Sequence, residues 1–227
     1  MKKITVYFIL LSTILTSGKV LAQNFRLGLT TSPSIAWFKS ETDNYNSEGV
    51  RFGISYGLLS EFILAEQYTF ATGIQVVYFG GKLSYPESDE VGTEFPSLER
   101  TYRLQNVEVP LTLKMKTREI GYNTYFARFG FGVSANLTSK ADDVPFNPTT
   151  TARGAETTNE IKGQIPLFRV SMIVGIGFEH SLGGTTALVT GINFNNGFTN
   201  ILKGTTLEDR NKQARANFLE LSVGILF

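Results

Sequence analysis

Apolar and polar positions alternate along nearly all of the chain after residue 23. Residues 216–227 show this most clearly, with Leu219, Leu221 and Val223 on one face and Glu220, Ser222 and Gly224 on the other. Alternation with a period of two indicates β-strands whose two faces meet different surroundings. The sequence therefore predicts an all-β chain.

The two faces of the predicted strands differ in an unusual way. One face is aliphatic and aromatic, whereas the other is small, rich in glycine and charged, as in residues 122–139 with Arg128, Gly130 and Gly132. Glycine weakens a strand that faces solvent, but small side chains fit a narrow barrel lumen. The pattern favours a barrel whose apolar face meets lipid and whose polar face lines the lumen. A soluble periplasmic β-barrel with an apolar ligand cavity is the alternative.

Eight segments carry the alternation: residues 24–38, 50–64, 68–84, 101–117, 122–139, 164–181, 185–201 and 216–227. Short connections follow the second, fourth and sixth segments, and longer ones follow the first, third, fifth and seventh. This rhythm predicts an eight-stranded antiparallel up-and-down transmembrane β-barrel over residues 23–227, with short periplasmic turns and longer extracellular loops. An even number of strands places both termini in the periplasm. Pro110 lies inside a strand and indicates a bulge or kink.

The first 22 residues have the composition of a secretory signal peptide. A basic start at Lys2 and Lys3 precedes an apolar run, and Val20-Leu21-Ala22 resembles a cleavage site. An uncleaved anchor is the alternative, but Lys19 ends the apolar run early. We expect cleavage near Ala22 and export to the outer membrane of a Gram-negative cell.

Aromatic residues near the predicted strand ends suggest rings at the membrane interface. They are Trp37, Phe38, Tyr68, Phe70, Tyr78, Phe79, Tyr102, Tyr122 and Tyr125. The chain also ends on an aromatic residue, Phe227, after alternating apolar positions. A terminal Phe in this setting resembles the signal that barrel-assembly machinery reads during insertion.

Composition excludes several functions. The chain has 227 residues, and 21 Lys and Arg against 20 Asp and Glu give a net charge of +1, which excludes a nucleic-acid binder acting through bulk charge. Without cysteine there is no thiolate catalysis and no Cys-ligated metal. His180 is the single histidine, and its neighbour Ser181 points to the other face of a strand. We predict no enzyme activity, no catalytic residues, no cofactor and no metal. We interpret the acidic residues 87–94 as ordinary solvated charges of a loop rather than as a cation site.

Charged residues on the small face are the most specific chemistry in the sequence. The inward set is Arg26, Arg51, Glu108, Lys114, Lys116, Arg128, Arg169, Glu179 and Glu220. Charges of both signs in a narrow lumen of low dielectric must pair. Because eight strands enclose little more than side chains, we predict a structural plug of ion pairs rather than a transport path.

One segment resembles a known family. Leu104-Gln-Asn-Val-Glu-Val-Pro-Leu-Thr-Leu-Lys114 is similar to a strand of PorT-family outer-membrane β-barrel proteins, and the following strand, from Tyr125 to Val133, fits the same pattern. The opening Phe25 to Ser34 resembles the family's first strand. The resemblance implies an eight-stranded outer-membrane barrel. The named family member belongs to the type IX secretion apparatus, but no motif here carries that role.

The sequence thus predicts a small non-enzymatic barrel with a closed polar lumen, which acts through its extracellular loops. Its expected partners are outer-membrane lipid, the assembly machinery and an envelope or secretion complex. Membership of the type IX secretion apparatus is one alternative, and a lipid- or peptide-processing enzyme is another.

Overall fold

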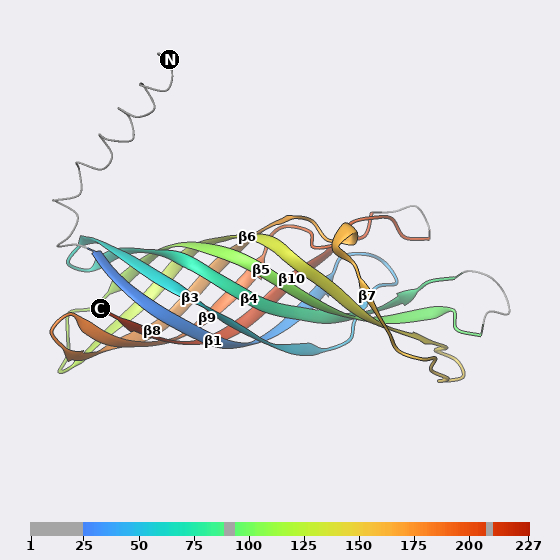
Figure 1. Ribbon diagram of the computed structural model, residues 1–227, viewed down its shortest axis with the longest axis horizontal. Helices are drawn as coiled ribbons and strands as arrows, with labels where there is room; N and C mark the ends of the chain where they lie inside the picture. Colours follow the sequence, from blue (N-terminus) through green and yellow to red (C-terminus); the bar gives the residue numbers. More distant parts are fainter. Residues whose placement is uncertain (1–24, 89–93, 208–210) are drawn as a thin grey trace, which may run out of the picture.

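One antiparallel sheet closes on itself to form a barrel (Figure 1). The computed structural model describes residues 25–88, 94–207 and 211–227, so the predicted signal peptide, residues 1–22, lies outside the described residues. The wall strands are β1 (Phe25–Ser40), β3 (Val50–Ala65), β4 (Tyr68–Pro86), β5 (Ser97–Lys116), β6 (Asn123–Phe146), β8 (Phe168–Gly183), β9 (Thr186–Gly197) and β10 (Ala214–Leu226). Two short strands, β2 (Asn46–Ser47) and β7 (Thr157–Glu160), and the 3-10 turn η2 (Lys162–Gln164) complete the fold.

Every wall strand is hydrogen-bonded to a neighbour on each side. Consecutive wall strands pair along the chain, and β1 closes the circle with β10 over the register Gly28↔Leu226 to Ser40↔Ala214. Closure removes free strand edges, which hydrocarbon does not tolerate. The prediction of an eight-stranded antiparallel barrel is confirmed. Among the described residues, no helix is long and apolar enough to cross a membrane.

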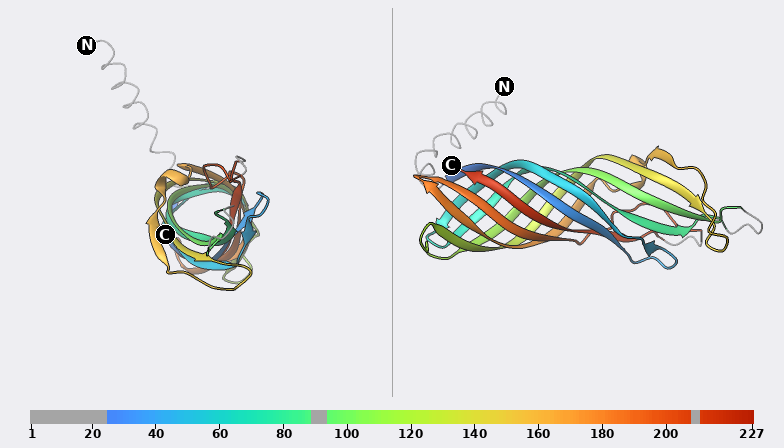
Figure 2. Two further views of the ribbon diagram at one scale, coloured as in Figure 1. Left: turned by 90° about the vertical axis from the view of Figure 1, so that its right-hand side faces the viewer. Right: turned by 90° about the horizontal axis from the view of Figure 1, so that it is seen from below.

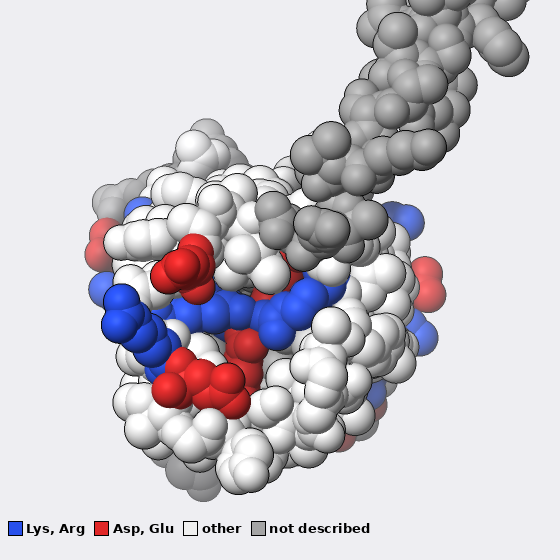
Figure 3. Space-filling view, turned by 90° about the vertical axis from the view of Figure 1, so that its left-hand side faces the viewer, with Lys and Arg blue, Asp and Glu red and all other residues white. Residues whose placement is uncertain are grey.

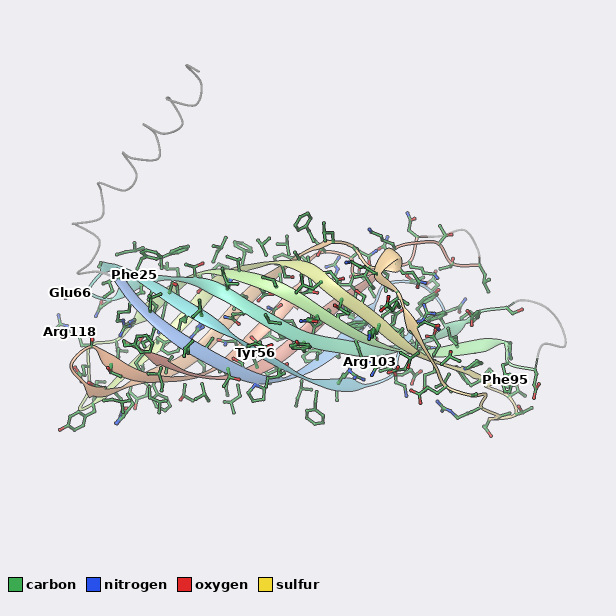
Figure 4. The ribbon with its side chains drawn as sticks, viewed as in Figure 1. Phe25, Tyr56, Glu66, Phe95, Arg103 and Arg118 are labelled. Atoms are coloured by element: carbon green, nitrogen blue, oxygen red, sulfur yellow. The ribbon has the colours of Figure 1, made fainter. Side chains whose placement is uncertain are left out.

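The two ends of the barrel differ. The start of β1 and the end of β10 lie together, since Leu27 and Phe227 exchange backbone hydrogen bonds of 3.1 and 2.8 Å. The short turns that contain Glu66 and Arg118 lie at this same end, near Phe25, whereas Phe95 lies among the long connections at the other (Figures 2 and 4). We call these the turn end and the loop end.

The outer face carries large apolar side chains, as the inverted alternation predicts. Phe52 is 81% exposed and Ile176 is 65% exposed, while the inward Ser55 and Ser171 are fully buried. On β5, alternate residues from Val109 to Met115 are exposed apolar side chains. This outer apolar belt is suited to lipid and not to water.

Strands β5 and β6 extend farthest beyond the predicted segments at the loop end. β5 begins at Ser97 and β6 continues to Phe146, because their hairpin keeps pairing beyond the belt, where β7 adds to β6 and β2 adds to β4. Pro110 does not produce the bulge that the sequence indicates. The β4–β5 register is the same on both sides of it, at Thr72↔Leu111 and Gln75↔Glu108, with no ladder pair between them. The missing proline donor interrupts the ladder without inserting a residue.

The loop half of the lumen contains a large apolar core, which the alternation does not predict. A cluster of buried side chains, here called the loop-side core, fills it: Ala36, Phe38, Tyr45, Val77, Phe79, Leu83, Tyr85, Leu98, Tyr102, Leu104, Ala141, Ile161, Ile165, Ile201, Leu202, Ala214, Ala216 and Phe218. The assignment of Phe38, Phe79 and Tyr102 to the membrane interface is therefore wrong, because all three point inward. Alternation identifies two faces, but a buried aromatic face and a lipid-facing one have the same period.

Two connections fold into the lumen to complete this core. Ile161 and Ile165 flank η2, and the amide of Ile161 donates to the carbonyl of Ser139 at 3.0 Å. Ile201 and Leu202 follow β9, and the amide of Lys203 donates to the carbonyl of Gln164 at 2.7 Å. The two connections are thus hydrogen-bonded to one another inside the loop end of the barrel.

We expect Phe218→Ala to destabilise the barrel strongly. Phe218 is fully buried and its ring centroid lies 5.6 Å from that of Phe79, so the truncation leaves a cavity worth about 3–5 kcal/mol of unfolding free energy. Urea unfolding of the protein folded in detergent measures the change. Leu207→Ala, at a loop residue that is 48% exposed, is the matched control and should shift stability by less than about 1 kcal/mol. Equal effects of the two substitutions would contradict a packed loop-side core.

Candidate functional site

Five charged side chains meet inside the turn end of the lumen. This mouth cluster comprises Arg26 of β1, Glu61 of β3, Lys114 and Lys116 of β5, and Glu179 of β8. Viewed from the turn end, basic side chains cross the opening with acidic ones on either side (Figure 3). Strands from opposite parts of the wall are thereby joined through the lumen.

Each carboxylate of the mouth cluster contacts all three cations. Glu61 accepts from Arg26 at 2.5 Å, from Lys114 at 2.6 Å and from Lys116 at 3.4 Å. Glu179 lies 2.9 Å from Arg26, 2.5 Å from Lys114 and 2.8 Å from Lys116. The Lys114 ammonium, fully buried, also lies 4.2 Å from the ring centroid of Phe126. These contacts offset the free-energy cost of removing the charges from water in a narrow lumen.

Glu61 contacts all three cations of the mouth cluster, yet it is absent from the inward set that the sequence predicts. It lies directly opposite Arg26 in the β1–β3 register. The signal was present, since Phe52, Ile54, Tyr56 and Leu58 set the outward phase of this strand and Glu61 continues the inward one. Extending the phase to the end of the strand would have found it.

A second polar cluster lies at mid-height, and we call it the midbarrel cluster. Arg169 of β8 donates to Asn195 Oδ1 at 2.6 Å and to the carbonyl of Ala216 at 3.0 Å, and lies 3.4 Å from Glu108 Oε2. Glu220 accepts a hydrogen bond from Ser55 at 3.1 Å. The Arg169 guanidinium also lies 5.4 and 5.2 Å from the ring centroids of Phe79 and Phe218. This cluster is therefore the boundary between the charged and apolar halves of the lumen.

Arg128 lies between the two clusters. It lines a cavity of about 30 Å³ together with Glu108, Asn193 and Glu220, and its guanidinium is 4.9 Å from the ring centroid of Phe126. Its Nε has no hydrogen-bond partner among the described residues. The cavity has polar walls and room for about one water molecule.

Arg51 does not join these clusters. Of the inward residues that the sequence proposed, Arg26, Lys114, Lys116 and Glu179 meet at the mouth, and Glu108, Arg169 and Glu220 lie at mid-height. Arg51 lies beside Phe52 and Tyr78, where β3 and β4 separate. Its position results from the separation of two strands, which alternation does not reveal.

The loop end contains an open cavity of about 400 Å³. Tyr45 and Tyr85 stack on one side of it, with ring centroids 4.4 Å apart, and Arg100, Lys203 and Lys212 also line it. Arg100 is held by Asp143 at 2.5 and 2.8 Å. Burial, together with the neighbouring Tyr102, raises the pKa of Tyr45 to about 12. The cavity thus offers neutral aromatic rings beside three cations and one carboxylate, Glu87.

The remaining residues that the sequence singled out are His180, the acidic loop and Phe227. His180 Nδ1 lies 2.9 Å from Asn123 Oδ1 at the turn end. No group of three metal-ligating side chains occurs in the part of the chain that the structure describes. Of the acidic loop, residues 89–93 lie outside the described residues. Phe227 is 54% exposed on the outer face, and its role as an assembly signal stays a prediction.

We expect Glu61→Gln to destabilise the barrel by about 3–5 kcal/mol, because it leaves three buried cations with one carboxylate. Glu66→Gln, in an exposed turn at the same end, is the control and should have little effect. Adding Lys114→Met to Glu61→Gln should restore much of the loss, since fewer charges then need partners. Urea unfolding measures these variants and Lys114→Met alone. A loss in the double variant equal to the sum of the two single losses would show that the mouth cluster is not energetically coupled.

A family match agrees with this architecture. Residues 21–203 match the family model described as "Outer membrane protein beta-barrel domain". No curated protein matches the chain. Similar solved structures include neisserial surface protein A (11% identity, 89% of this chain and 95% of that one, TM-score 0.44) and OprG from Pseudomonas aeruginosa (7%, 90% and 96%, 0.43). The outer membrane protease OmpT from Escherichia coli is also similar (9%, 90% and 96%, 0.42).

These structural similarities identify no function, because the identities are low and the matched structures include a protease. The finer resemblance to PorT-type proteins also stays a prediction. The family match spans most of the chain and includes seven of the eight wall strands up to Gly197. The chain belongs to the outer membrane protein β-barrel domain family.

Proposed function

We propose that this outer-membrane barrel is a non-enzymatic interaction protein that acts through its loop end, and that its lumen does not conduct. The observation that carries the proposal is the filling of the lumen. Side chains occupy it at three levels: the mouth cluster, the midbarrel cluster and the loop-side core. A barrel of eight strands has no space for a channel once such side chains are in place.

The loop end is the part of the molecule that remains available for recognition. The loop-end cavity combines the stacked Tyr45 and Tyr85 with Lys203 and Lys212, and it opens outward. Aromatic rings beside cations suit polar or anionic partners, and loops on a rigid scaffold commonly carry binding residues. The long β4–β5 and β5–β6 extensions support these loops beyond the membrane.

We expect the protein to show no single-channel conductance in planar bilayers. Glu61→Gln/Glu179→Gln should increase leakage in bilayers, because the three cations of the mouth cluster then repel one another. The matched control is Glu66→Gln/Glu119→Gln, two exposed carboxylates of the turns at the same end. Stable conductance steps from the unaltered protein would contradict the proposal.

We also expect partners to contact the loop end in cells. A photo-crosslinking amino acid in place of Lys203 should give defined adducts, whereas the same group in place of Arg118, in a turn at the opposite end, should not give them. Adducts only from the Arg118 position would overturn a loop-end function. Loss of exported cargo from a deletion strain would instead favour a component of the type IX secretion apparatus.

A further inference from the structure

The barrel wall opens between β3 and β4 toward the loop end. The two strands pair from Ala65↔Tyr68 to Ile54↔Tyr78 and no further. Beyond this point β3 pairs only with β1, and β4 pairs with β2 at Leu83 and Ser84. Between these ladders, residues 79–82 of β4 have no ladder pair on this side, although the carbonyl of Lys82 accepts from the amide of Glu48 at 2.9 Å. A cavity of about 250 Å³ lies here, and we call it the wall site.

Arg51 occupies the opening. Its Cδ lies 2.8 Å from where a Cβ on Gly80 would be, so the arginine stem crosses β4 at a position that has no side chain. Gly80 in turn lies directly opposite Arg103 on β5. The lack of a side chain at Gly80 therefore lets Arg51 approach the outer face near Arg103.

The wall site has an excess of positive charge. Arg103 and Lys140 lie directly opposite one another in the β5–β6 register, and both line the cavity with Arg51. Like charges at directly facing positions destabilise a sheet. Asp142 pairs with Arg103, and Glu160 faces Lys140 in the β6–β7 register. Among the described residues the Arg51 and Lys140 side chains form no ion pair or hydrogen bond, although Asp142 also attracts the Arg51 guanidinium. Three cations therefore face two carboxylates at the wall site.

The position of the wall site matches the edge of the outer apolar belt. Phe52, which is 81% exposed, and Tyr78 line the wall site, next to the lipid-facing Ile54 and Tyr56. Arg103 lies farther toward the loop end than Tyr56 (Figure 4). Cations directly above an apolar surface lie at headgroup depth in the leaflet that the loops face.

We propose that the wall site binds the phosphorylated headgroup of an outer-leaflet lipid. Arg51, Arg103 and Lys140 contact the phosphate, and acyl chains lie along Phe52 and Ile54. Charge complementarity selects the anion, and the adjoining apolar belt selects a lipid rather than a free phosphate. The inference goes beyond the proposed loop-end function and does not depend on it.

The test uses the full mature barrel refolded in neutral detergent. Native mass spectrometry measures binding of diphosphoryl lipid A, and of lipid A from which both phosphates have been removed. The variants are Arg51→Gln/Lys140→Gln and the same pair with Arg103→Gln; Arg118→Gln, an exposed turn arginine, is the control. A gel mobility shift on boiling verifies that each variant is folded. The double variant keeps the Arg103–Asp142 pair, so it tests the site even if the triple variant misfolds.

We expect the double variant to raise the dissociation constant for diphosphoryl lipid A at least about tenfold, with Arg118→Gln unchanged. Removing the phosphates from the lipid should weaken binding to the unaltered protein by a similar factor. Unchanged affinity of the double variant, or equal binding of dephosphorylated lipid A, would overturn the proposal. Competition by millimolar inorganic phosphate that abolishes lipid A binding would also overturn it, because it would identify a free-phosphate site.

Discussion

Hydrocarbon offers no partner for a backbone amide or carbonyl, and this constraint determines the rest of the structure. It requires every wall strand to have two neighbours, which the β1–β10 ladder achieves by joining the first and last wall strands. With eight strands the closed sheet encloses a space only as wide as its own side chains. Small residues such as Ser55 and Ser171 are fully buried there. The remaining space has to be filled by groups that satisfy each other.

The lumen meets this requirement in two different ways. At the turn end, three cations and two carboxylates compensate each other, while at the loop end aromatic and aliphatic side chains pack as in a soluble protein. Arg169 connects the charged and the apolar part of the lumen, because its guanidinium donates a hydrogen bond to Asn195 and lies against the rings of Phe79 and Phe218. A planar, weakly hydrated cation is suited to such a boundary.

Much of the wall could be predicted from the sequence, because strands between lipid and lumen alternate without exception over long stretches. Most predicted strand ends lie within a few residues of the observed ones, as for residues 68–84 against Tyr68–Pro86. The lumen was less predictable. Alternation places Tyr78 and Phe79 on opposite sides of the wall. It does not show that aromatic side chains also fill the lumen at this height, so the sequence alone assigns both residues to the membrane interface. The inward-folded Ile161 and Ile201 belong to connections, where no periodicity applies.

The mouth cluster also bears on how the barrel forms. Arg26 and Glu179 are 153 positions apart in the chain, yet they form an ion pair of 2.9 Å within the mouth cluster. A sheet that has not yet closed would present Lys114 and Glu61 to lipid without their full set of partners, at a large cost in free energy. Partly assembled intermediates are thereby penalised, and the Arg26–Glu179 pair can form only when distant strands of the wall come together. The buried charges thus make closure a cooperative event and disfavour a barrel left partly open.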